Sequence, residues 1–158
     1  METITIKNLL RIVKYVDGDG IILEDIISKN EFEVRFLGID APEMKYCNKV
    51  KKDEKELNIP AELLIKLGYA SLDYLKKKTK VGEFCTLIQE KNNLKDKYGR
   101  YLGYLVLENG KVLNEIMVEN GYAKPYNEVF CEMLPKYQEL FLKAKSKKKG
   151  LFKIINNF

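Results

Sequence analysis

The N-terminal quarter of the chain alternates between short apolar runs and turn residues. Residues 9–16, 21–27 and 32–39 are rich in Val, Ile, Leu and Phe, a composition typical of β-strands. The segments between them, Asp-Gly-Asp-Gly at 17–20 and Ser-Lys-Asn at 28–30, are turn formers. This pattern predicts a three-stranded meander.

Strand character returns later in the chain. Residues 81–90 and 101–107 are again apolar and flank the turn Lys-Asp-Lys-Tyr-Gly at 95–99. Together with the meander they give five predicted strands. No internal repeat interrupts the pattern.

Helical periodicity occupies the rest of the chain. Pro60 suits a first helical turn, and small or apolar residues then recur on one side to about Lys78. Further helices are predicted at 112–120 and 132–149, each followed by a glycine. Residues 45–58 are crowded with charge and predict a mobile surface loop. Five strands in a three-plus-two order, with a helix between the third and fourth, indicate an α+β protein: a five-stranded OB-fold barrel with three α-helices.

Length and composition fit one domain spanning residues 1–158. With 158 residues and 46% hydrophobic content, the chain can bury a core without disulfides. Its three cysteines are widely spaced and odd in number, which argues against a disulfide framework or a zinc knuckle. No apolar run is long enough to span a membrane, and residues 1–10 lack the core of a signal peptide. We expect a monomer, cytoplasmic as read, or secreted if an export segment has been removed.

The charged residues narrow the possible chemistry. The chain contains no histidine, which excludes Ser-His and Cys-His dyads and most zinc sites. A net charge of +5 is compatible with a polyanionic partner. Only three of the 28 basic residues are arginine, at positions 11, 35 and 100. Arginine is needed where a planar fork must hold a phosphate or carboxylate, so Arg35 and Arg100 are candidates for such a role.

Two acidic segments each allow a structural and a chemical interpretation. The segment 17–20 suits a tight hairpin turn, and it is no EF-hand loop because Ile21 and Ser28 stand where calcium ligands would be needed. The segment 40–43, Asp-Ala-Pro-Glu, suits a simple chain reversal after a strand. It can also offer two oxygen ligands and a base in one loop, which Asp19 can complete as an oxygen-only site favouring Ca²⁺.

The basic candidates also have ordinary alternatives. Arg35 can form a salt bridge with Asp40, and the segment 96–100 can be a plain glycine turn.

Three segments in this order resemble the staphylococcal nuclease-like family. They are Val-Asp-Gly-Asp-Gly at 16–20, Arg-Phe-Leu-Gly-Ile-Asp-Ala-Pro-Glu at 35–43 and Asp-Lys-Tyr-Gly-Arg at 96–100. The resemblance extends from about Leu9 to Phe152. It implies that Asp19, Asp40 and the carbonyl of Ala41 bind Ca²⁺.

The resemblance also implies the catalytic roles. Glu43 would orient or deprotonate the attacking water, and Arg35 and Arg100 would hold the phosphate under attack. Further roles in substrate binding fall on four residues: Lys97 and Tyr98 at a neighbouring phosphate, Tyr122 and Tyr126 lining a nucleotide pocket. The last two tyrosines are equally compatible with core or barrel-rim packing.

The chain departs from the family pattern at three places. Gly20 and Ala41 stand where Thr is common, and the charged segment after Glu43 is longer or differently composed. The expected activity is that of a calcium-dependent endonuclease acting on single-stranded or frayed DNA and on RNA, by in-line attack of water, leaving 3′-phosphates. The alternative is a non-catalytic OB-type module that binds nucleic acid.

Overall fold

A closed five-stranded barrel forms one half of the molecule. The computed structural model describes residues 3–158. Neighbouring strands in the barrel follow the order β1-β2-β3-β6-β5. Their bounds are β1 Ile4–Asp17, β2 Gly20–Asp25, β3 Glu31–Phe36, β5 Phe84–Glu90 and β6 Tyr101–Leu107. The predicted OB-fold barrel is therefore confirmed, with a first strand that begins earlier than expected.

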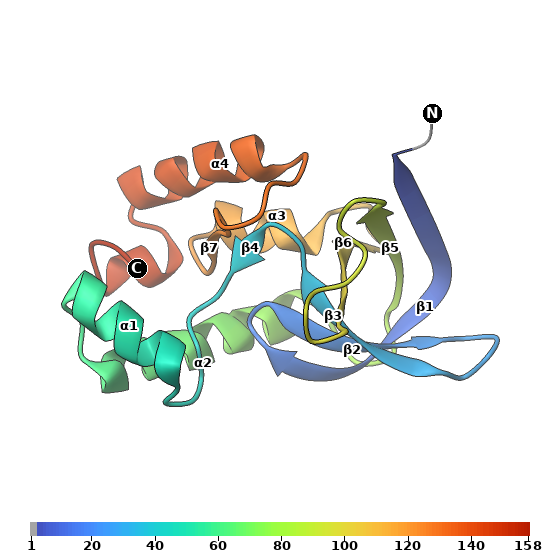
Figure 1. Cartoon of the computed structure of the whole chain (residues 1–158), viewed down its shortest axis with the longest axis horizontal. Helices are drawn as coiled ribbons and strands as arrows, with labels where there is room; N and C mark the ends of the chain where they lie inside the picture. Colours follow the sequence, from blue (N-terminus) through green and yellow to red (C-terminus); the bar gives the residue numbers. More distant parts are fainter. Residues whose placement is uncertain (1–2) are drawn as a thin grey trace.

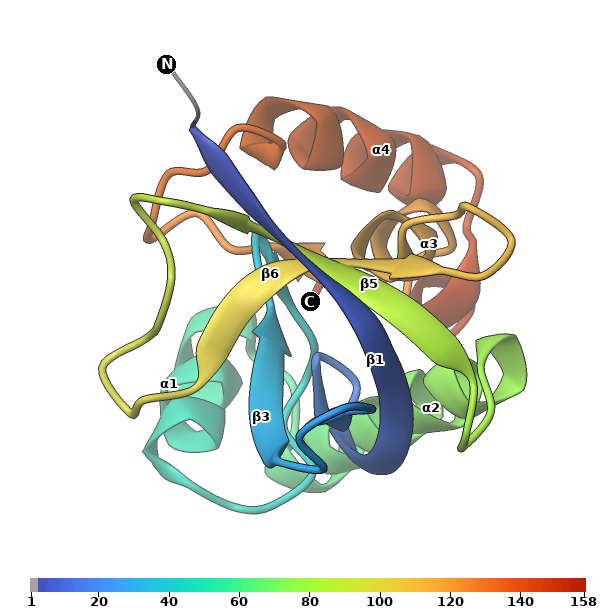
Figure 2. The ribbon, with the colours of Figure 1, turned by 90° about the vertical axis from the view of Figure 1, so that its right-hand side faces the viewer.

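The long strand β1 closes the barrel. It pairs antiparallel with β2 at one end and with β5 at the other, with register shifts between Lys7 and Leu10 and between Ile12 and Lys14. Such irregularities bend a strand and let it serve both neighbours. On the other side, β3 and β6 pair in parallel. Figure 2 shows β1 running across the front of the barrel, where it crosses β5.

Strand alternation decides which side chains enter the core. Val34 and Phe36 on β3 are fully buried inside the barrel, whereas the side chain of Arg35 between them is 14% exposed. Because successive residues of a strand point to opposite faces, Arg35 lies on the outside of the barrel wall.

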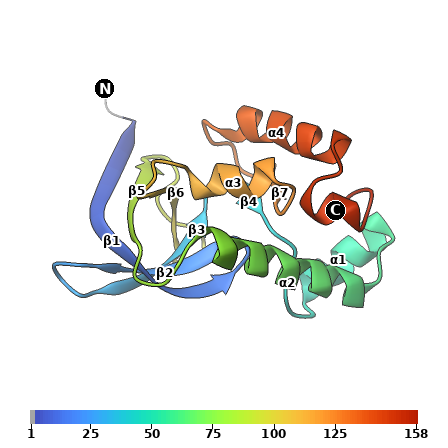
Figure 3. The same cartoon turned by 180° about the vertical axis from the view of Figure 1, so that it is seen from behind.

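Four α-helices and a 3₁₀ turn cover the other half of the molecule. The helices pack around a two-stranded pair at the centre of Figures 1 and 3. Their bounds are α1 Asn48–Leu57, α2 Ala61–Lys78, α3 Leu113–Glu119, α4 Leu134–Ser146 and η1 Gly150–Lys153, and the pair consists of β4 Ile39–Asp40 and β7 Lys124–Pro125.

Helix α1 corrects the prediction of a surface loop at 45–58. That prediction is wrong for residues 48–57, which makes four α-helices in the described chain rather than three. Val50 is 1% exposed and belongs to a second apolar cluster with Leu64 and Phe152, and Leu57 packs against the same cluster. Two apolar residues seven positions apart are enough to dock a short helix against a preformed surface.

Within residues 3–158, the structure contains no helix long and apolar enough to cross a bilayer.

Candidate active site

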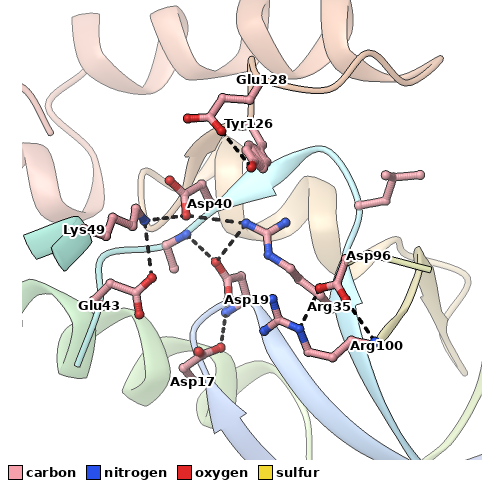
Figure 4. A network of polar contacts seen from close by, with 12 residues as sticks. Asp17, Asp19, Arg35, Asp40, Glu43, Lys49, Asp96, Arg100, Tyr126 and Glu128 are labelled. Atoms are coloured by element: carbon pink, nitrogen blue, oxygen red, sulfur yellow. Dashed lines mark hydrogen bonds and ion pairs between the residues drawn. The ribbon is translucent and has the colours of Figure 1, made fainter. Parts of the chain in front are cut away.

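The predicted site residues come from four separate places in the chain. Asp19 lies in the turn between β1 and β2, and Arg35 is the penultimate residue of β3. Asp40 ends β4, and Arg100 immediately precedes β6. Figure 4 shows these four side chains gathered on the outer wall of the barrel. The fold thus brings the three motifs of the sequence into one site.

Arg35 links the two aspartates. Its Nη2 atom lies 3.8 Å from Oδ2 of Asp19 and 3.6 Å from Oδ1 of Asp40. The guanidinium also lies over the ring of Tyr126, 4.6 Å from the ring centre. The salt bridge between Arg35 and Asp40, which was the structural alternative for Arg35, is therefore present, but it is one part of a larger charged cluster.

The Asp19 carboxylate also fixes the loop that follows β4. Its Oδ2 atom accepts the main-chain N–H of Ala41 at 2.9 Å. Asp19 and Asp40 are both largely buried. Burial raises the pKa of Asp40; the charges of Lys49 and Arg35 oppose the shift, and that of Asp19 adds to it.

Glu43 is positioned by close contact between its main chain and helix α2. A Cβ atom built on Gly68 would lie 2.5 Å from the carbonyl oxygen of Glu43 and 2.7 Å from that of Pro42. Only glycine lets the segment lie this close to the helix. The Glu43 side chain is 36% exposed, and its Oε1 atom accepts a hydrogen bond from Lys49 at 3.4 Å.

Arg100 is held by the acidic residue that begins its own turn. Oδ2 of Asp96 accepts the Nε–H of Arg100 at 2.7 Å, and Oδ1 accepts the main-chain N–H groups of Tyr98 and Arg100. Nη1 of Arg100 lies 3.7 Å from Oε2 of Glu33. The Nε contact fixes the guanidinium plane and leaves terminal N–H groups for a ligand.

A cleft of about 360 Å³ opens beside the two arginines. Lys97, Tyr98, Arg35, Arg100 and Tyr126 all line it. The exposed ring of Tyr98 has Lys97 Nζ at 5.2 Å and the Arg100 guanidinium at 5.6 Å from its centre. The structure therefore brings Lys97, Tyr98 and Tyr126 together with the arginines.

Tyr122 occupies a different environment. Its ring stacks on Tyr74 of α2, with centres 4.1 Å apart, and it packs against the apolar core. Of the two tyrosines proposed for the nucleotide pocket, Tyr126 lines the cleft beside the arginines. Tyr122 instead packs against the core, which was the alternative interpretation for both tyrosines.

Three polar residues of this region were not singled out from the sequence. Asp96 holds Arg100, and its place four residues before an arginine in a glycine turn was the available signal. Asp17 accepts the N–H of Asp19 at 3.1 Å, and burial together with the Asp19 charge raises its pKa. Lys49 lies on α1, which the sequence did not predict, so no signal pointed to it.

Gly20, which stands where Thr is common in the family, lies close to the carboxylate of Asp17. A Cβ atom on Gly20 would lie 2.9 Å from Oδ1 of Asp17. Threonine at this position would therefore require the carboxylate of Asp17 to shift.

The predicted metal ligands fit a hard cation by their chemistry. Within residues 3–158, no three His, Cys, Asp or Glu side chains converge as a complete ligand set. The predicted donors are two carboxylates, from Asp19 and Asp40, and the main-chain carbonyl of Ala41. An all-oxygen set completed by water suits Ca²⁺.

Comparison with known proteins identifies the family of the chain. A family model described as staphylococcal nuclease homologue matches residues 33–153. Endonuclease YhcR of Bacillus subtilis is 32% identical over 145 residues, covering 88% of this chain but 11% of that protein. This chain therefore spans only about a tenth of the length of YhcR.

Two further relatives are matched over most of their length. A protein of Methanocaldococcus jannaschii named Uncharacterized protein MJ1439 is 29% identical over 153 residues, covering 93% of this chain and 72% of that protein. A protein of Escherichia coli O157:H7 named Uncharacterized endonuclease is 29% identical over 143 residues, covering 90% of this chain and 75% of that protein. Because the family model matches well over half of the chain, this protein belongs to the staphylococcal nuclease homologue family.

Proposed function

We propose that this protein is a calcium-dependent endonuclease that hydrolyses phosphodiester bonds of DNA and RNA and leaves 3′-phosphates. The observation that carries the proposal is the cluster in which Arg35 lies within 4 Å of both Asp19 and Asp40, beside the cleft lined by Arg100. Carboxylates for a cation and two forked cations for a phosphate are the groups that such a reaction needs. The family membership and the names of two relatives support the nuclease part of this proposal.

The residues divide the work as follows. Glu43 takes a proton from a water molecule, whose oxygen attacks phosphorus in line with the departing 5′-oxygen. Arg35 and Arg100 donate hydrogen bonds to the phosphoryl oxygens and stabilise the extra negative charge of the five-coordinate state. A Ca²⁺ ion held by Asp19, Asp40 and the Ala41 carbonyl would supply further positive charge to a phosphoryl oxygen.

Substrate binding falls to the cleft beside the arginines. Lys97 and Tyr98, both exposed at its edge, hold the neighbouring phosphate, and the ring of Tyr126 packs against the guanidinium of Arg35. An open cleft lined by cationic and aromatic side chains suits a flexible single strand or a frayed duplex. We further propose that the chain acts as one domain and as a monomer.

Incubation with single-stranded DNA and RNA tests this function directly. We expect cleavage with roughly millimolar Ca²⁺, little with Mg²⁺ and none with a chelator, because few carboxylates and several waters suit the larger, more adaptable ion. Analysis of the product ends should find 3′-phosphates. Equal rates in Mg²⁺ would contradict the calcium assignment. Binding of the strand without cleavage in any metal would favour the alternative, a non-catalytic OB-type binding module.

A further inference from the structure

Helix α1 places the ammonium of Lys49 next to two carboxylates of the proposed mechanism, those of Asp40 and Glu43. Nζ of Lys49 lies 2.7 Å from Oδ1 of Asp40 and 3.4 Å from Oε1 of Glu43. In Figure 4 the side chain reaches across from α1 to the segment after β4. Asp40 is the proposed metal ligand and Glu43 the proposed base.

Lys49 and Arg35 share the charge of Asp40. Both lie within 4 Å of the same oxygen, Oδ1, in the part of the chain that the structure describes. Arg35 reaches Asp40 from the barrel wall and also reaches Asp19, whereas Lys49 reaches it from the opposite, helical side together with Glu43. Arg35 and Lys49 therefore offset part, but not all, of the negative charge of Asp19, Asp40 and Glu43.

The positive charge of Lys49 opposes the binding of a second cation on this side of the cluster. Its ammonium donates a hydrogen bond to Asp40 Oδ1 at 2.7 Å, and a lysine side chain is charged at neutral pH. A divalent cation that binds the same Asp40 oxygen would meet this charge at close range, and two adjacent cations repel each other.

We propose that Lys49 is a tethered cation that competes with the divalent metal for Asp40, so that metal binding must displace its ammonium. The proposal rests on the metal site of the proposed function. It assigns Lys49 as a positioning residue that sets the affinity for metal and keeps the carboxylates together when metal is absent.

The structure provides room for the displaced side chain. A cleft of about 640 Å³, lined by Asp40, Lys49 and Lys52 among others, opens between α1 and the segment after β7. Lys49 is one-third exposed and lies at its wall. The backbone of α1 can stay docked, because Val50 next to Lys49 is buried in the apolar cluster of α2 and the C-terminal segment. Rotation about the side-chain bonds of Lys49 is sufficient.

Calcium titration by calorimetry tests the competition without measuring catalysis. Lys49→Met keeps a similar volume and removes the charge, and we expect it to bind Ca²⁺ about 10-fold more tightly than the wild type. Lys52→Met is the matched control, because Lys52 lies on the same helix but is exposed and faces Glu56 at 4.0 Å. The control should bind Ca²⁺ within about twofold of the wild type, since exposed charges are screened.

Thermal melting separates competition from a purely structural role. In chelator, Lys49→Met should melt below the wild type because the carboxylates lose their counter-charge. Saturating Ca²⁺ should raise its melting temperature by more than it raises that of the wild type. If Lys49 is only a structural partner, the variant melts lower in both conditions and gains no affinity. Lys49→Gln repeats the test should the Met variant fold poorly.

The outcomes distinguish this inference from the function on which it rests. If the wild type binds Ca²⁺ and Lys49→Met binds it equally or more weakly, the competition is wrong and the calcium site stands. If neither protein binds Ca²⁺, the proposed metal site is wrong and the competition falls with it.

Discussion

Oδ2 of Asp96 accepts a hydrogen bond from Nε of Arg100 at 2.7 Å and so orients the guanidinium. The other carboxylate oxygen, Oδ1, accepts two main-chain N–H groups of the same turn. Burial acts to raise the pKa of Asp96. The hydrogen bonds that Asp96 accepts from the main chain and the guanidinium of Arg100 outweigh burial, so the pKa lies below its ordinary value of 3.8. The ionised form therefore stabilises the turn above the unfolded pKa, and this stabilisation is lost as the pH falls through the folded pKa.

Asp96→Asn should lower kcat about 10-fold. The amide oxygen can still accept main-chain N–H groups, but the charged contact that orients the Arg100 guanidinium is lost, and misplaced catalytic groups are costly. Steady-state rates on a single-stranded substrate measure the effect. Asp73→Asn, an exposed change on α2, is the control and should be silent. Wild-type kcat in Asp96→Asn would show that Arg100 needs no such support.

Gly68→Ala should destabilise the protein, although alanine normally favours a helix over glycine by about 1 kcal/mol. The added methyl would lie 2.5 Å from the carbonyl oxygen of Glu43, so the segment carrying the proposed base must move. We expect a net loss of about 1–3 kcal/mol in unfolding free energy, as in other overpacked sites, together with a lower kcat. Urea unfolding and rate measurements on one preparation check both. Lys66→Ala, exposed on the same helix, should be neutral or stabilising.

The barrel strands and the positions of several candidate site residues could be predicted from the sequence, because strand alternation and turn chemistry depend only on neighbouring residues. Alternation on β3 puts Val34 and Phe36 inside and Arg35 outside, so the direction of Arg35 follows from the strand assignment. The Asp-Gly-Asp-Gly segment likewise puts Asp19 in the turn immediately before β2.

Contacts between segments that are distant in the sequence could not be predicted from such local patterns. Helix α1 depends on Val50 joining an apolar cluster that includes Phe152, about a hundred residues later in the chain. The charged segment around it has two apolar positions that face this cluster, Val50 and Leu57, and these gave little periodic signal. The contact of Lys49 with Asp40 could be predicted only if the position of α1 were already known. Tyr122 and Tyr126 are four residues apart with the same chemistry, and only the packing of α2 against Tyr122 separates their environments.

Glu43→Gln should fold normally and lower kcat about 10²-fold or more, as expected when a general base is removed. Glu43 is partly exposed and its contact with Lys49 is long at 3.4 Å, so little stability depends on its charge. Rates and melting temperature should be measured together. Glu139→Gln on the exposed face of α4 is a matched control, since its partner Lys143 lies at 3.5 Å in solvent. An unchanged kcat in Glu43→Gln would remove Glu43 from the mechanism.

Arg100→Lys tests whether the forked guanidinium, rather than positive charge alone, is required. In the proposed mechanism the guanidinium donates two hydrogen bonds to the phosphate, and these strengthen as negative charge accumulates during attack. Lysine keeps the charge but cannot form the fork. We expect kcat to fall about 10²-fold or more, in the range found when a preorganised donor to the transition state is removed. Binding of a nucleotide inhibitor should weaken less, because attraction to a point charge survives.

The contacts of Arg100 with Asp96 and Glu33 allow a competing explanation in which this residue only stabilises the turn. That explanation predicts a lower melting temperature with normal turnover per folded molecule at low temperature, whereas the catalytic role predicts slow turnover by a protein that melts nearly as the wild type does. Arg11→Lys supplies the matched control, because Arg11 makes an equally short contact with Glu24, 2.8 Å from Nε to Oε1, on β1 and β2 away from the cleft. The same chemical change should therefore leave kcat unaltered at position 11. Loss of activity at position 100 alone, with both variants folded, requires that the guanidinium of Arg100 act on the substrate.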